Sequence, residues 1–259
     1  MGAPGWLTPQ WPDLPANVGA LATTRVGGVS PAPYDDGHGG GGRNLGLHVG
    51  DDAVRVEQNR LLVQESVPGR PAWLAQVHGI AVVDAADAGV EAPVADASIA
   101  SSVGAVCAIM TADCLPVLFA DLDGKVVGGA HAGWRGLAAG VLEATVRAMR
   151  TAGAGEITAW LGPAIGPTAF EVGADVRAAF LAAIPASPEE VGAAFAPYPG
   201  RDGKYLADMN ALARLVLARE GVTRVWGGAH CTVTQADLFY SYRRDGVTGR
   251  QASLIWIKQ

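Results

Sequence analysis

The spacing of apolar positions changes along the chain and predicts where helices and strands lie. Asp51 and Asp52 precede an apolar series that includes Val54 and Leu61. Carboxylates at this place cap a helix and interact favourably with the positive end of its dipole. The pattern therefore predicts a helix that runs to about Glu65.

The next part of the chain is rich in short apolar runs with β-branched residues, which are typical of buried strands. These runs cover residues 80–83, 105–110, 115–120 and 126–130. The turn sequence Asp121, Leu122, Asp123 and Gly124 separates the last two runs. It predicts that they form a β-hairpin.

Helical spacing returns in the second half. Apolar residues recur every three or four positions at Leu137, Val141, Leu142, Val146 and Met149, which predicts one long helix over residues 134–150. Further helices are expected over 174–183 and 205–219, and strands over 224–228, 238–242 and 253–257. Strands and helices in this irregular order predict a mixed α/β (α+β) fold, in which helices flank mixed β-sheets. The length of 259 residues favours one domain over residues 1–259.

Composition narrows the possible partners. Hydrophobic residues make up 49% of the chain and charged residues 17%, which indicates a folded protein with a large core. The 25 acidic and 19 basic residues give a net charge of −6, so no positive field gathers nucleic acid. We expect small-molecule substrates and no nucleic-acid partner.

The sequence also lacks signals for export or membrane insertion. Residues 1–15 contain no basic residue and no long apolar run, and no later stretch has the ~18 consecutive apolar residues of a membrane span. Cys107, Cys114 and Cys231 are an odd set without a CxxC pair, which argues against a disulfide framework. We therefore expect a soluble, cytoplasmic protein in which a special cysteine would be a ligand or a nucleophile.

Glycine-rich motifs do not indicate nucleotide binding. Residues 37–42 formally match GxGxxG, but prolines and an Asp pair precede them, whereas a dinucleotide site needs a strand there and a helix after it. We interpret them as a flexible surface loop. The chain has no GxxxxGK[ST] motif, which excludes a P-loop.

Two histidines and one cysteine lie at predicted junctions between elements. His78 is followed by Gly79 just before a strand, Cys114 stands between two strands, and His131 stands between a strand and a helix. Two imidazoles and one thiolate suit a catalytic zinc site with an open fourth position. Taken singly, Cys114 also fits a small buried residue and the histidines fit turn positions, because no short metal motif ties the three together.

The whole chain resembles the YfiH family, also called laccase-domain or multicopper polyphenol oxidase-like proteins. The resemblance is carried, in order, by TRVGGVS at 24–30, NLG at 44–46, QVHG at 76–79, TADCLPV at 111–117, AHAGWRG at 130–136, LGPAIGP at 161–167 and FYSYRR at 239–244. It implies a mixed α/β domain, related to a cysteine-hydrolase-like fold, with zinc at His78, Cys114 and His131. It also implies phosphorolysis of adenosine, inosine and methylthioadenosine, and deamination of adenosine. Residues 37–42 resemble an insertion, which leaves the substrate range open.

The laccase and deaminase labels need separate tests. Five histidines with no HxH pair are too few for a blue-copper centre with a trinuclear cluster, so zinc is favoured over copper. The HxE and PCxxC signature of zinc deaminases is also absent, so deamination would use another scaffold.

Phosphorolysis needs groups that hold an anion. Arg135 lies at the start of the predicted helix after His131, where its guanidinium and free backbone N–H groups would bind phosphate. Further substrate-binding residues are expected among the family motifs and the neighbouring helix: Arg25, Asn44, Arg60, Gln76 and Arg243. Asp113, beside Cys114, fits either a catalytic carboxylate that orients a ligand or moves a proton, or a turn carboxylate.

Two other classes of function remain open at this stage. Cys114 and His131 also match the dyad of a cysteine hydrolase, a class that the resemblance links to editing of peptidoglycan precursors. A metal-binding protein without catalysis is the third class. Metal content discriminates among them, because a metal-bound thiolate is a poor free nucleophile.

Overall fold

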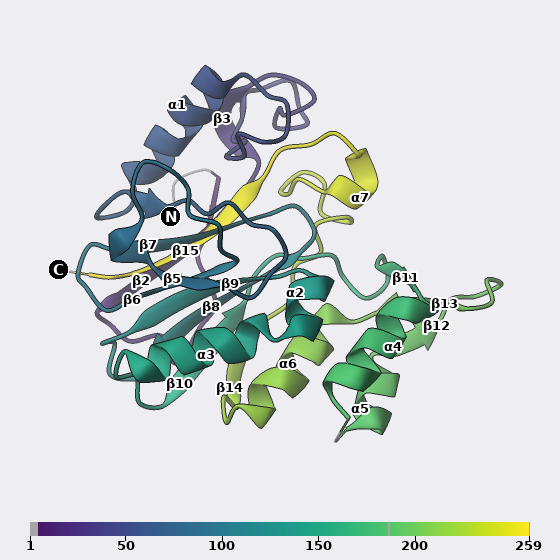
Figure 1. Ribbon diagram of the computed structural model, residues 1–259. Helices are drawn as coiled ribbons and strands as arrows, with labels where there is room; N and C mark the ends of the chain where they lie inside the picture. Colours follow the sequence, from purple (N-terminus) through teal and green to yellow (C-terminus); the bar gives the residue numbers. More distant parts are fainter. Residues whose placement is uncertain (1–4, 186, 259) are drawn as a thin grey trace.

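Two β-sheets pack face to face at the centre of the protein, and helices cover their outer faces (Figure 1). The computed structural model describes residues 5–185 and 187–258. Within these residues the strands form sheets of five, six and three strands. Both large sheets contain parallel and antiparallel pairs, which confirms the mixed α/β class. Residues 1–4 lie outside the described residues. They belong to the segment 1–15, in which the sequence predicts no export signal.

The five-stranded sheet combines segments from both ends of the chain. In spatial order it contains β1 (Trp6–Leu7), β2 (Val18–Thr23), β15 (Gln251–Ile257), β7 (Val106–Thr111) and β4 (Pro71–Ala72). The expected strand over 253–257 is therefore confirmed as the inner strand β15. Helix α1 (Ala53–Gln64) covers the outer face, together with β3 (Val26–Ser30). The Asp52 carboxylate caps α1 by accepting a hydrogen bond from the Val54 N–H, as the sequence predicts.

The six-stranded sheet forms the second central layer. In order it contains β14 (Arg224–Gly227), β10 (Ile157–Leu161), β8 (Leu115–Asp121), β9 (Val127–Ala132), β6 (Ala97–Ala100) and β5 (Val82–Asp84). β8 and β9 pair in antiparallel fashion, so the predicted hairpin is confirmed. Every residue of β8 is buried, because alternate side chains face the other sheet and the helices. This explains its continuous apolar run.

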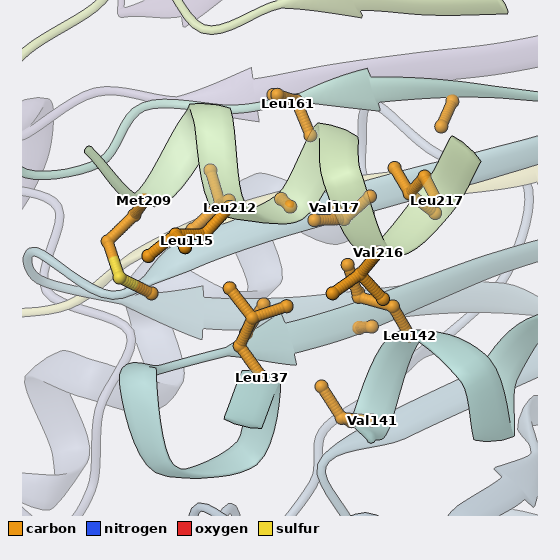
Figure 2. Close-up of a cluster of buried hydrophobic side chains, with 14 of the residues drawn as sticks. Leu115, Val117, Leu137, Val141, Leu142, Leu161, Met209, Leu212, Val216 and Leu217 are labelled. Carbon is orange, nitrogen blue, oxygen red and sulfur yellow. The ribbon is translucent and has the colours of Figure 1, made fainter. Parts of the chain in front are cut away.

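The remaining helices cover the outer face of the six-stranded sheet and the small sheet. They are α2 (Trp134–Ala139), α3 (Val141–Thr151), α4 (Ala174–Ala183), α5 (Pro188–Ala193) and α6 (Met209–Arg219). The small sheet contains β11 (Glu171–Gly173), β13 (Lys204–Ala207) and β12 (Phe195–Pro197). Figure 2 shows Leu115 and Val117 of β8 in one cluster with Leu212 and Val216 of α6. The core thus holds the beginning of β8, which directly follows Cys114.

Several sequence predictions of elements are wrong, in part or altogether. Residues 204–207 form β13, and the helix expected from 205 begins only at Met209, because the Asp208 side chain caps it there. No strand covers 238–242 among the described residues. Phe239 and Tyr240 are instead buried in a loop before the short helix α7 (Tyr242–Asp245), which accounts for the large aromatic side chains in this segment. β5 begins at Val82, two residues later than expected.

The long helix expected over 134–150 is two helices, because Gly140 breaks it. Gly140 adopts φ +102°, and its N–H closes α2 by donating to the carbonyls of Gly136 and Leu137. The apolar spacing continues across the break because both helices face the same sheet. Spacing alone therefore does not reveal the interruption.

Gly140→Ala is expected to lower the free energy of unfolding by about 1–2 kcal/mol, because a Cβ disfavours a positive φ. The closest atom to that Cβ would be Glu143 Oε2 at 3.6 Å, so the effect would come from the backbone and not from a clash. Gly155→Ala is the matched control, because its Cβ would have no neighbour within 4 Å and its φ is not positive. Urea unfolding of both variants checks this; equal stabilities would contradict it.

The glycine-rich segment is only in part the surface loop that the sequence predicts. Residues 37–40 are exposed, and the Asp36 carboxylate accepts hydrogen bonds from the N–H groups of His38 and Gly40. Gly42 is packed against the chain, since a Cβ there would lie 1.8 Å from the Tyr34 carbonyl oxygen. No helix follows this segment directly in the described chain, so it does not form a dinucleotide site.

The helices can also be compared with the thickness of a membrane. Within residues 5–185 and 187–258, none is long and apolar enough to cross one.

Candidate active site

A cavity of about 410 Å³ lies where the chain passes from one large sheet to the other. β7 of the five-stranded sheet leads through residues 112–114 directly into β8 of the six-stranded sheet. α2 and α7 lie beside this end of the sheets (Figure 1). The polar side chains of the cavity wall include His48, Gln76, His78, Asp113, Cys114, His131, Arg135, Arg243 and Arg250. Residues 37–42 of the described chain are not part of this wall.

Three possible metal ligands converge in the cavity. One ligand atom each from His78, Cys114 and His131 lies within 4.8 Å of the other two. Cys114 Sγ is 3.7 Å from His78 Nε2, and the two imidazole centroids are 4.7 Å apart. The sequence placed all three at element junctions, and the fold brings these junctions together.

Asp96, which the sequence analysis did not single out, holds both histidines. Its carboxylate is fully buried, and Oδ1 lies 2.8 Å from His131 Nδ1. Oδ1 also accepts the His78 N–H, and Oδ2 accepts the N–H groups of Val77 and Gly79. One carboxylate therefore fixes the His78 turn and places the proton of His131 on Nδ1, which leaves Nε2 free to bind a metal.

The space around the three donors suits a metal ion. A Cβ at position 133 would lie 2.7 Å from His78 Cδ2 and 3.1 Å from Cys114 Sγ, so only glycine leaves this space open. Two imidazole nitrogens and one thiolate match a zinc site with a free fourth position. The same donors also bind copper, so the donor set alone does not decide between the two metals.

The thiol and the buried imidazole shift each other's ionisation. Burial raises the pKa of Cys114, but hydrogen bonds and positive charge from His131 and His78 outweigh it, so the pKa is lowered overall. Burial lowers the pKa of His131, but its hydrogen bonds to Asp96 and Cys114 raise it above the ordinary value. The site therefore stabilises a thiolate, the form that binds metals and attacks electrophiles.

Asp113 is in the cavity wall, but its carboxylate holds two other segments. Oδ1 accepts the Thr232 hydroxyl at 2.6 Å, and Oδ2 accepts the Arg243 N–H at 2.6 Å. Asp113 has φ +97° and His78 has φ +61°, and among the described residues these are the non-glycine residues with positive φ. Backbone strain is thus concentrated at this site, as is common for functional loops.

Three of the other expected site residues line the cavity. The Gln76 amide donates to the Met110 carbonyl and accepts the Met110 N–H, so it also joins the wall to β7. The Arg135 guanidinium lies 4.4 Å from the centroid of the Trp134 ring. Arg243 donates to the Glu171 carbonyl. Both arginines are exposed and face the cavity from α2 and α7.

The remaining three lie elsewhere. The buried Arg25 guanidinium donates to the Asp35 and Ala236 carbonyls, which favours a structural role. Arg60 lines a neighbouring cavity. Asn44 is buried, and its Oδ1 accepts the Arg250 N–H, so it contacts the backbone of an arginine that lines the cavity.

Sequence reasoning missed Arg250 and His48 as well as Asp96. Arg250 and His48 line the cavity, but nothing in their local sequence distinguishes them from surface residues. Burial lowers the pKa of Arg250 and of His48. Asp96 did carry a signal, because it is a single charge between the small apolar residues Ala95 and Ala97, where a carboxylate must find partners.

Known proteins show similarity over nearly the whole chain. A family model described as multi-copper polyphenol oxidoreductase laccase matches residues 19–258. A purine nucleoside phosphorylase of Pseudomonas aeruginosa is 53% identical over 253 residues, which cover 98% of each chain. The purine nucleoside phosphorylase YfiH of Escherichia coli is 49% identical and covers 97% of this chain and 98% of its own. The crystal structure of a Neisseria meningitidis protein has a TM-score of 0.90 at 50% identity, and covers 98% of this chain and 100% of that one.

Proposed function

The chain belongs to the YfiH family, and we propose that it is a zinc-dependent purine nucleoside phosphorylase that also deaminates adenosine. The names of the relatives support phosphorolysis. The observation that carries the proposal is the meeting of His78, Cys114 and His131 with three arginines in one cavity. The substrates would be adenosine, inosine and methylthioadenosine together with phosphate, in the cytoplasm.

The arginines supply the anion site that phosphorolysis requires. A phosphate oxygen forms a bond to C1′ of the ribose, the bond from C1′ to the purine nitrogen breaks, and its electron pair leaves with the base. Arg135, Arg243 and Arg250 face the same cavity, so phosphate held among them would lie close to the reacting sugar. Their positive charge also balances the negative charge of the bound phosphate.

The zinc ion would be held by His78, Cys114 and His131. Asp96 would keep the proton of His131 on Nδ1, so that Nε2 could bind the metal. When bound, zinc supplies Lewis-acid character toward the purine. We assign Asp113 to positioning, because both of its carboxylate oxygens already accept hydrogen bonds. Its partners join the Cys114 turn to α7, which presents Arg243.

A cysteine hydrolase that edits peptidoglycan precursors is the second candidate. The lowered pKa of Cys114 beside the raised pKa of His131 favours it, because this pair resembles an activated nucleophile and its base. That mechanism leaves His78 without a role, whereas zinc binding uses all three side chains. A metal-binding protein without catalysis would not require the arginines around the cavity.

Separation of products from a nucleoside panel, with and without phosphate, tests the proposed function. We expect free base from adenosine and inosine only with phosphate, and inosine from adenosine in either buffer. Arg135→Ala should reduce phosphorolysis about tenfold or more, because a charge-assisted contact is lost, and should leave deamination nearly unchanged. Arg55→Ala, on the exposed face of α1, is the control. No turnover of any nucleoside would refute the function, and equal losses in both reactions would remove Arg135 from the phosphate site.

A further inference from the structure

A second cavity of about 670 Å³ adjoins the first. His48, Gln76 and Met110 line both cavities. The two cavities therefore meet at these three side chains, and a ligand that occupied both would pass beside them. The first cavity alone is already within the range of about 300–1,000 Å³ that holds a small ligand. A free nucleoside and phosphate therefore do not need the second cavity.

The second cavity has an apolar wall. Trp73 and Leu74 are buried beneath it, at 7% and 2% exposure. Leu47, Val77 and Val90 line it and are 44%, 60% and 85% exposed. Apolar side chains that remain exposed around a hollow are typical of a ligand-binding surface. This wall would bury a hydrocarbon chain.

Two guanidinium groups give the same cavity an excess of positive charge. Arg60 lies 4.7 Å from the centroid of the Trp73 ring, and its Nε donates to a backbone carbonyl. Its other nitrogens have weak partners, the Glu57 carboxylate at 3.5 Å and the Met110 sulfur at 4.0 Å. Arg70 adds a second positive charge. Two arginines against one glutamate favour an anionic group, and guanidinium groups bind carboxylates well.

We propose that the second cavity binds a 5′ substituent of the nucleoside, apolar along its length and carrying a carboxylate at its end. This inference rests on the proposed function, because it assumes that the ribose occupies the first cavity. A substituent on the 5′ carbon leaves the reacting bond at C1′ unchanged. The preferred substrate class is therefore larger than a free nucleoside.

Calorimetry with 5′-thioethers of inosine tests this inference on the zinc-loaded protein. The probes carry methyl, n-butyl or 3-carboxypropyl on sulfur. In phosphate-free buffer they cannot be phosphorolysed, and inosine has no amino group to lose, so the dissociation constants do not depend on catalysis. Each buried methylene strengthens binding by up to about fourfold. We expect n-butyl to bind at least about tenfold more tightly than methyl, and 3-carboxypropyl to bind still more tightly.

Variants locate the effect. Arg70→Gln should remove the advantage of the carboxylate over n-butyl, and Ala92→Trp, in the wall of the same cavity, should remove the advantage of n-butyl over methyl. Arg55→Gln is the matched control, because this exposed arginine contacts the Val29 carbonyl outside the cavity, and should keep both ratios.

Three results would overturn the inference. They are equal dissociation constants for the three probes, ratios that Ala92→Trp and Arg70→Gln do not change, and an absence of binding. If nucleosides are still phosphorolysed in any of these cases, the proposed function stands without the second cavity. Tighter binding of the longer probes without any turnover would support the second cavity and refute the phosphorylase.

Discussion

Asp96→Asn is expected to lower zinc affinity by about tenfold to a hundredfold while the protein still folds. Asp96 Oδ1 accepts from His131 Nδ1 and from the His78 N–H, and Oδ2 accepts from Gly79 and Val77. Asparagine has one side-chain oxygen, so it can supply an acceptor at the position of Oδ1 or of Oδ2, but not at both. With its oxygen toward Gly79, its NH₂ group faces His131 Nδ1 and moves the imidazole proton to Nε2. The nitrogen that would bind the metal is then blocked.

Competition with a chromogenic chelator measures the affinity, and nitrogen chemical shifts of the imidazole report the tautomer. Asp121→Asn is the matched control, because Asp121 is also buried and accepts two backbone N–H groups, but it lies at the end of β8 and outside the cavity wall. Both variants should lose about 1–3 kcal/mol of stability. Equal zinc affinities in the two variants would show that Asp96 acts only on the fold.

Periodicity predicted the strands that are buried on both faces and the helices that have one buried face. β8 and β9 are buried on both faces, so their apolar runs and the turn between them are enough to predict the hairpin. α6 has apolar positions at helical spacing, and its body was predicted correctly. Where a residue is buried for another reason, as Tyr240 is in a loop, apolar character alone gives the wrong element.

Spacing did not predict the strands β2 and β6 or the layer arrangement. β6 has only four residues, β2 contains Gly19, and neither has a run long enough to stand out. Pairing of β2 with β15 joins residues more than 200 positions apart. Such contacts depend on tertiary packing, which local sequence does not encode.

The residue types and their places at element junctions predicted that His78, Cys114 and His131 could bind a metal together. The resemblance to the family strengthened this prediction. Histidine and cysteine are rare in this chain, so three of them at junctions carried information. The arginines carried less, because arginine is common here and also serves as an anchor for backbone carbonyls. Arg25 sits in a family motif yet holds two carbonyls, whereas Arg250, which faces the cavity, stands outside the motifs.

Alkylation of Cys114 is expected to be at least about tenfold slower in the zinc-loaded protein than after chelation, because a metal-bound thiolate is masked. Activity should fall with the metal, and Cys114→Ser should lose both zinc and at least about 99% of activity, because a hydroxyl is a poor zinc ligand. Mass spectrometry of the separate cysteine peptides measures the rates. A dyad of Cys114 and His131 predicts the opposite: fast, inactivating alkylation that zinc does not slow, in a protein that is active without metal.

The other two cysteines make the measurement internally controlled. Cys231 is half-buried outside the cavity wall, and its Sγ accepts the Gly166 N–H, so its alkylation rate should not depend on zinc. Cys107 is fully buried, which raises the pKa of its thiol to about 12, and it should stay unmodified while the protein is folded. Faster alkylation of all three thiols after chelation would indicate unfolding. Acceleration at Cys114 alone would identify it as a ligand, because only removal of the metal then exposes its thiolate.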